Sequence, residues 1–191
     1  MGKLILGVFF LVFCLSNNLS AQELTLQKVK KIASDVTKKF ESQLKKELKN
    51  AKRSGGIDAM TEYCINDSKK ILEKLNKKYN PKISIKRVSL NNRNEKAKPL
   101  DEEIKILKAF DLIQKSDAYE PKQIVQIVSE NRYKVYSPIT MNSRDCKKCH
   151  GVKNKINKKS QKRFFEVYKN KKGFGHKSGD IRGAVVVTIS K

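Results

Sequence analysis

The chain has 191 residues and a formal net charge of +24 at neutral pH, because 43 Lys and Arg residues outnumber 19 Asp and Glu residues. A charge of this size suits binding to nucleic acid or to an anionic membrane. However, the basic residues are nearly all Lys, occur in every segment and do not alternate with aromatic residues as on a surface that stacks single-stranded bases. The composition therefore argues against a nucleic-acid-binding protein, and the length suits one domain with its own core.

Residues 1–21 are typical of a secretory signal peptide. Lys3 supplies a positive charge, an apolar run extends from Leu4 to Leu15, and cleavage is expected after Ala21. A membrane anchor is the alternative, but the run falls short of the roughly 20 residues that span a bilayer. No second apolar run follows, so we expect an exported, periplasmic protein with no membrane span after cleavage.

A long amphipathic helix is predicted at the N-terminus of the mature chain, within residues 22–54. Its apolar residues recur at steps of three and four from Leu26 to Leu48, so they form one stripe. Gly55 and Gly56 should end this helix, which could pack on its own domain or against a second copy of the chain. The main domain should therefore comprise residues 55–191. Two further helices are predicted in it, over residues 58–78 and 100–115.

Strands dominate the second half of the chain. The hydrophobic pattern predicts four of them, over residues 82–90, 123–129, 132–140 and 183–190. Short links such as Glu130-Asn131 indicate an α+β fold with a mainly antiparallel sheet and helices on one side of it. The last strand is apolar on both faces and should be central. Residues 141–180 should be mostly loop, with one short helix near residues 161–168.

The sequence Cys146-Lys147-Lys148-Cys149-His150 is the strongest chemical motif in the chain. A structural zinc site needs four ligands, but the second Cys-x-x-Cys pair that usually completes one is absent. A redox dithiol usually opens a helix within a βαβ unit, whereas this motif should lie in a polar loop, and a plain disulfide gives the His no role. In an exported chain the motif predicts one covalently attached haem c, with thioethers from Cys146 and Cys149 and with His150 as the first axial ligand of the iron.

The sixth ligand of the iron is left open by the residues themselves. Four side chains are candidates: Cys64, His176, Met60 and Met141. Cys64 is the odd cysteine of the mature chain once both thioethers have formed. It also lies on the apolar stripe of its predicted helix, where a cysteine often serves as a small core residue. The residues alone favour neither interpretation of Cys64.

With these residues assembled, the chain resembles a known family, the exported c-type haem domains with a PAS-like fold. Members occur alone or as the extracytoplasmic sensors of histidine kinases. The resemblance covers about residues 55–190. The matching segments are Ala59–Cys64, Arg87–Leu90 with Arg93-Asn94, Pro99 with Glu103, Tyr136–Ile139, Gly151 after the motif, and Gly179–Ala184.

The resemblance implies a PAS-like antiparallel sheet with flanking helices, and it makes Cys64 the distal ligand opposite His150. A thiolate ligand lowers the reduction potential of a haem iron. With both axial positions filled, we expect a redox or diatomic-gas sensory or binding module, and not an enzyme. The alternative is a periplasmic electron-transfer cytochrome, which its positive charge would steer to an acidic partner. In either role the partner should be a separate signalling or electron-transfer protein, while the sequence leaves the oligomeric state open.

Overall fold

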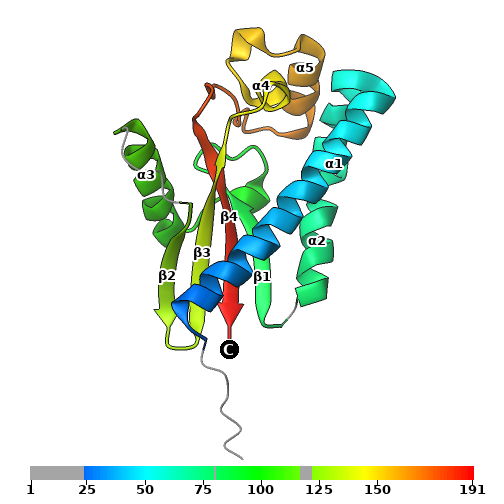
Figure 1. Cartoon of the computed structure of the whole chain (residues 1–191). Coiled ribbons are helices and arrows are strands. Elements are labelled where there is room, and N and C mark those ends of the chain that lie inside the picture. Colours follow the sequence, from blue (N-terminus) through cyan, green and yellow to red (C-terminus); the bar gives the residue numbers. More distant parts are fainter. Residues whose placement is uncertain (1–23, 80, 117–121) are drawn as a thin grey trace, which may run out of the picture.

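The computed structural model describes residues 24–79, 81–116 and 122–191, so the predicted signal peptide lies outside the described residues. Figure 1 shows the chain with its helices around a single sheet. Among the described residues, none of the helices combines the length and the apolar character that a membrane span requires. The helices are α1 (Leu26–Asn66), α2 (Ser68–Tyr79), α3 (Asp101–Lys115), α4 (Arg144–His150) and α5 (Lys158–Val167), with short 3₁₀ turns η1 (Glu95–Ala97) and η2 (Lys153–Lys155).

The sheet has four strands in the order β1-β4-β3-β2, and every neighbouring pair is antiparallel. The strands are β1 (Ile83–Val88), β2 (Ile124–Ser129), β3 (Arg132–Thr140) and β4 (Ile181–Ser190). The central place of β4 confirms the expectation from its apolar residues, and the α+β class with an antiparallel sheet is confirmed with it. Gly183 leaves no room for a side chain, since a Cβ atom there would sit 2.2 Å from the carbonyl oxygen of Val88.

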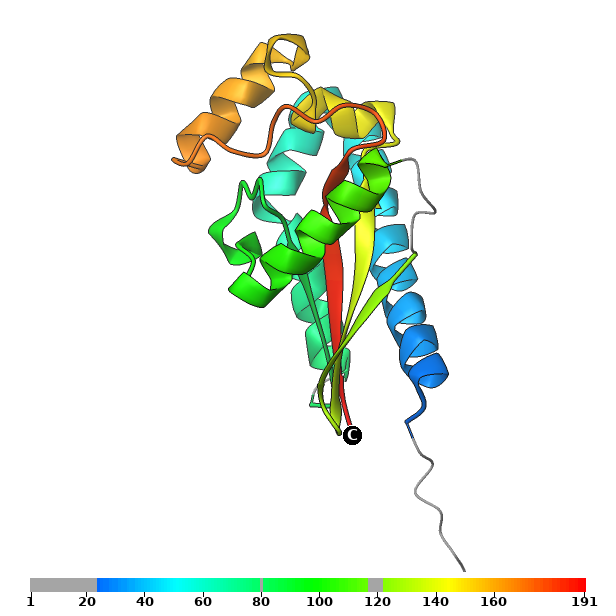
Figure 2. The same cartoon turned by 90° about the vertical axis from the view of Figure 1, so that its left-hand side faces the viewer.

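Helices cover both faces of the sheet, so the expectation of helices on one side was wrong. Val185, Val187 and Ile189 of β4 pack against α1 and α2. Ala184 and Val186 point the other way and pack against α3 (Figure 2). The physical reason is the sequence of β4 itself, since a strand that is apolar on both faces needs cover on both sides.

The first half of α1 crosses one face of the sheet diagonally (Figure 1). Its buried residues Val29, Ala33, Val36 and Phe40 belong to the same core as Ile85 of β1 and the β4 valines. The larger side chains, those of Val29, Val36 and Phe40, each contribute about 1.5–3 kcal/mol when they are removed from water. The long helix predicted within residues 22–54 therefore packs on its own sheet and shares the core of residues 55–191.

Gly55 and Gly56 interrupt α1, as the sequence predicts, because neither residue has helical dihedral angles. Gly56 has φ 63° and ψ −142°, a left-handed conformation that favours glycine, and the helix then resumes as far as Asn66. The helix predicted over residues 58–78 is thus divided at Asp67, between the end of α1 and α2. The kink changes the direction of the chain, so the second half of α1, which carries Cys64, reaches the end of the sheet at the top of Figure 1.

Residues 141–180 form a cap over that end of the sheet, built from α4, η2, α5 and the loops between them (Figures 1 and 2). Cys149, Ile156, Phe164 and Phe174 make a third hydrophobic core there, with Ile57 and Ile65 of α1 packed against it. The expected helix near residues 161–168 is present as α5, but α4 is an addition. A helix of seven residues is too short for a periodic hydrophobic pattern, which explains why the sequence indicated a loop.

Candidate functional site

The Cys-x-x-Cys-His motif lies on α4, contrary to the polar loop expected from the sequence. Ser143 begins the helix, and its Oγ atom accepts a hydrogen bond from the backbone N–H of Asp145 at 3.2 Å. Helical residues three positions apart share a face, so Cys146 and Cys149 lie side by side on α4. Cys149 is buried and Cys146 is partly buried. Because the motif lies on a helix, its position no longer argues against a redox dithiol. The motif still follows an antiparallel hairpin, whereas a redox dithiol usually belongs to a βαβ unit.

Gly151 ends α4 and leaves no room for a side chain. A Cβ atom at this position would lie 2.4 Å from the backbone oxygen of Lys147, to which the Gly151 N–H donates at 2.9 Å. The Gly151 carbonyl then accepts from the N–H of Gly175 at 2.8 Å, and the His150 carbonyl accepts from the N–H of His176 at 3.1 Å. The end of the motif is thus tied to residues 173–176.

The His150 ring is held through its Nδ1 atom. The carbonyl oxygen of Gly173 lies 2.9 Å from Nδ1, and Nε of Arg182 lies 3.3 Å from it. These contacts need opposite tautomers, because Nδ1 donates to the carbonyl but accepts from the guanidinium. The shorter contact favours Nδ1–H donating to Gly173, which leaves the Nε2 lone pair for a metal ion.

The imidazole of His150 is neutral at pH 7. Burial, followed by the charges of Arg182 and Arg93, lowers the pKa of His150 well below its ordinary value. A neutral imidazole is the form that binds a metal ion. The environment of His150 therefore suits an axial ligand.

Arg93 connects the motif to the rest of the cap. Its Nη2 atom donates to the carbonyl oxygens of Cys149 at 2.7 Å and of Gly173 at 3.0 Å. The guanidinium lies 3.7 Å from the ring centroid of Phe164 and 4.4 Å from that of Phe174. Burial lowers the pKa of Arg93 to about 10, so it stays charged at neutral pH. Arg93 thus positions the same carbonyl that orients His150, a role that sequence reasoning missed, because only the family resemblance had singled this residue out.

Arg182 is a second buried arginine beside His150. Its Nη1 atom donates to Ser89 Oγ at 2.6 Å and to the Asn91 carbonyl at 3.1 Å. The Ser89 hydroxyl donates in turn to the Arg182 carbonyl at 2.7 Å. Burial lowers the pKa of Arg182 to about 9. These bonds tie the segment that follows β1 to the start of β4, beside the histidine.

Cys64 lies on the second half of α1, partly buried beneath the cap. Burial raises the pKa of its thiol to about 12; the charge of Cys149 raises it further, and those of Arg87 and Arg93 oppose the shift. Residues of α1, α4 and β1 are therefore close enough here for their charges to shift one another's pKa. The structure thus brings Cys64 into the neighbourhood of Cys146 and Cys149.

The other three candidates for a sixth ligand have different surroundings. Met60 and Met141 are 4% and 1% exposed, as core residues are. His176 Nε2 lies 3.4 Å from Asn91 Nδ2, and burial lowers the pKa of His176 to about 4. Among the described residues, no three His, Cys, Asp or Glu side chains are placed to hold one metal ion. The zinc alternative, which needs four ligands in a closed site, therefore has no assembled ligand set in the described chain.

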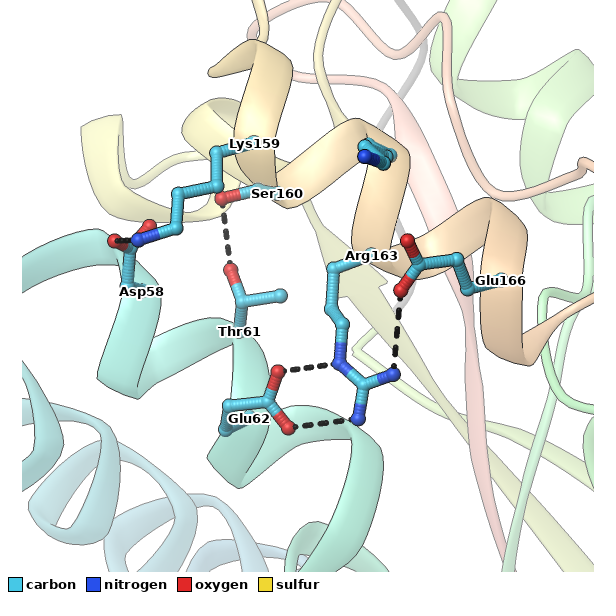
Figure 3. Close-up of a pocket in the computed structure, with 8 residues that line it drawn as sticks. Asp58, Thr61, Glu62, Lys159, Ser160, Arg163 and Glu166 are labelled. Atoms are coloured by element: carbon cyan, nitrogen blue, oxygen red, sulfur yellow. Dashed lines mark hydrogen bonds and ion pairs between the residues drawn. The ribbon is translucent and has the colours of Figure 1, made fainter.

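A clamp of polar contacts, which we call the α1–α5 clamp, joins the Cys64 helix to the cap (Figure 3). Arg163 donates two hydrogen bonds to the Glu62 carboxylate, from Nε at 2.6 Å and from Nη2 at 3.2 Å. Lys159 forms an ion pair with Asp58 at 2.5 Å. Thr61 Oγ1 donates to Ser160 Oγ at 2.8 Å in the buried part of the contact. The exposed ion pairs add little stability, and a surface pocket of about 350 Å³ between these residues is lined by groups that already pair with one another. We assign the clamp a positioning role.

Comparison with known proteins supports this architecture. The crystal structure of the cyanobacterial haem protein Tll0287 is similar to the present structure, with a TM-score of 0.58 and 17% sequence identity over 87% of this chain and 97% of that one. At this identity the likeness shows a common fold. A search of curated proteins gave no match.

The model of the Tll0287-like family matches residues 16–190. The match extends beyond the segment from residue 55 onward that carried the resemblance in sequence, and it includes the long helix α1. Because it spans almost the whole chain, this protein belongs to the Tll0287-like family.

Proposed function

We propose that this protein carries one haem c, attached through Cys146 and Cys149, and works as an exported redox or diatomic-gas sensory module. The single observation that carries the proposal is the arrangement on α4, where two neighbouring thiols precede a neutral histidine held at Nδ1 by Gly173. The shared fold with Tll0287, whose crystal structure is that of a haem protein, supports it.

The donor set fits a haem with two vinyl groups. Each thiol would add across one vinyl double bond, so that sulfur bonds to carbon, the thiol hydrogen moves to the neighbouring carbon, and no oxidant is consumed. Cys146 and Cys149 lie three residues apart on one helix, as two attachments to the same ring require. Arg93 and Gly173 would keep His150 in one orientation while the ring is in place.

Cys64 is our proposed distal ligand, opposite His150. In the ligand-free chain its raised pKa keeps it a thiol at neutral pH, so iron would have to displace a proton to bind the sulfur. The α1–α5 clamp, together with Ile57 and Ile65 in the third core, would hold this part of α1 against the cap.

When bound, the haem supplies an iron that changes oxidation state and exchanges axial ligands. With His150 and Cys64 as ligands, no coordination position is left for a substrate, so we propose a binding or sensory role and no enzymatic one. Loss or exchange of the Cys64 ligand would be the signal. The output would pass to a separate signalling protein outside the cytoplasm.

A periplasmic electron-transfer cytochrome is the second candidate, favoured by the net charge of +24. Such a charge would speed encounters with an acidic redox partner and make them sensitive to salt. Stopped-flow reduction by a soluble donor separates the two roles. A carrier should exchange electrons rapidly without a change of ligands, whereas a sensor should show a spectral change that reports ligand exchange.

The test of haem attachment is expression with a haem-c maturation system. Wild-type protein should keep its haem through denaturation and gain the mass of one haem, whereas Cys146→Ala with Cys149→Ala should lose it. Cys64→Ala is the matched control, because it removes a thiol from the same site without removing an attachment point. A wild-type mass equal to that of the bare polypeptide would overturn the proposal.

A further inference from the structure

Arg87 is a cation of the site for which the described residues provide no partner. It lies on β1 opposite Val185 of β4, and alternation along the strand puts its side chain on the same face as Ile85, toward α1. Among the residues that the structure describes, none forms a hydrogen bond or an ion pair with its guanidinium. Arg93 and Arg182 differ from it, because backbone carbonyls and a hydroxyl occupy their donors.

No carboxylate of the described residues forms an ion pair with Arg87 or acts on its charge. The groups whose charges act on it are Cys64, Tyr168 and Cys146, two thiols and a phenol. The charges of Arg87, Arg93 and Arg182 all act on His150. A partly buried guanidinium with five unused N–H donors is costly unless an anion pairs with it. The described part of the chain therefore provides no anion to pair with Arg87 in this cluster of like charges.

We propose that Arg87 binds a carboxylate of the haem, an inference that rests on the proposed function. A haem brings two propionate groups to its site, and a guanidinium can bind a carboxylate through two parallel hydrogen bonds. Arg87 lies in the neighbourhood of Cys64, Cys146 and His150, the residues that would hold the ring. The ring that these residues attach would thus bring the missing anion to Arg87.

If Arg87 contacts the haem, the Arg87→Met substitution should change the stability of the protein in opposite directions with and without haem. Without haem the variant should unfold at a higher urea concentration than wild type, because a partly buried, unpaired charge has been removed. With covalent haem it should unfold at a lower urea concentration than wild type, because the carboxylate loses its partner. Arg87→Lys keeps the charge, so in each form its unfolding midpoint should lie between those of wild type and Arg87→Met.

Lys86→Met is the matched control, because it removes one charge from the neighbouring position on the opposite face of β1. Lys86 pairs with the buried Glu103 at 2.7 Å, so its loss should destabilise both forms alike. If Arg87→Met also destabilises both forms alike, Arg87 is a structural residue and the inference is wrong.

The reduction potential gives an independent test on the holoprotein. Arg87→Met should lower the potential, because a lost cation and an unbalanced carboxylate both favour ferric iron. The same shift should persist in a Cys64→Ala background. An unchanged potential would overturn the inference, and so would a shift that vanishes without Cys64, because the thiolate would then be the partner of Arg87. Absence of covalent haem from wild type is a separate result, which overturns the proposed function itself.

Discussion

At the scale of single residues, the site depends on backbone carbonyls as much as on the motif. His150 and Arg93 both bind the carbonyl oxygen of Gly173, and Arg93 also binds that of Cys149. Gly173 has φ 85°, and a Cβ atom there would lie 2.9 Å from the Cβ of Arg93. The orientation of the histidine is thus determined by residues more than 20 positions away from it.

Replacing Cys64 tests the distal ligand directly. Cys64→Ala should leave the covalent haem in place, raise its reduction potential and open a position for carbon monoxide, because an anionic ligand that favours ferric iron is lost. Cys64→Met should restore a six-coordinate iron at a higher potential than wild type. Optical spectra and redox titrations of the three proteins measure this. If Cys64→Ala matches wild type in both, Cys64 is a core residue only.

Replacing Arg93 tests the support of the motif. Arg93→Lys keeps the charge but loses the planar group between Phe164 and Phe174 and its paired donors. We expect the free energy of unfolding to fall by about 2–4 kcal/mol, as for a broken buried hydrogen-bond network. Urea denaturation measures the change. Arg163→Lys on the exposed face of the α1–α5 clamp is the control and should change stability by about 0.5 kcal/mol or less, so equal losses in the two variants would contradict the assignment.

At the scale of elements, short segments with special geometry make the site. α4 has seven residues, begins at the Ser143 cap and ends at Gly151. The kink at Gly55 and Gly56 directs the second half of α1 toward the cap. Both features bring residues together that are far apart in the sequence, since Cys64 and Cys149 come from different helices.

Gly151→Ala should weaken the end of α4. Its Cβ atom would meet the backbone oxygen of Lys147, which cannot move without opening the helix. We expect a loss of about 1–3 kcal/mol in stability, typical of overpacking, and a lower yield of protein with attached haem. The control is Lys148→Ala, an exposed change on the same helix that should alter stability by about 0.5 kcal/mol or less. Wild-type stability and haem content in Gly151→Ala would refute the argument.

At the scale of the whole molecule, one sheet carries two cores and the cap adds a third. The core beneath α1 and α2 supports the first half of α1, and the third core supports α4 and α5. The cap is therefore joined to the sheet partly through α1 itself, which contributes to both cores. A core substitution in the first half of α1 should therefore lower the stability of the whole domain.

Phe40→Ala tests that view of α1. Phe40 is 1% exposed in the core beneath the helix, so its truncation should cost about 3–5 kcal/mol, typical of a large buried aromatic. The control is Leu26→Ala in the same helix, where the side chain is 50% exposed and the loss should be about 0.5 kcal/mol or less. Denaturation of both variants measures the difference. A small effect of Phe40→Ala would mean that the first half of α1 is dispensable to the core.

The sequence by itself determined the α+β class, the four strands and the central place of β4, because hydrophobic alternation follows directly from which faces are buried. It also predicts Cys146, Cys149 and His150 as the haem-binding residues, since their spacing is a local property of the chain. Only the tertiary structure decided that α3 covers the second face and that α4 is a helix. It alone showed Arg93 and Arg182 around His150, and Arg87 without a partner among the residues that the structure describes. These features arise from contacts between residues distant in sequence, and no local pattern records them.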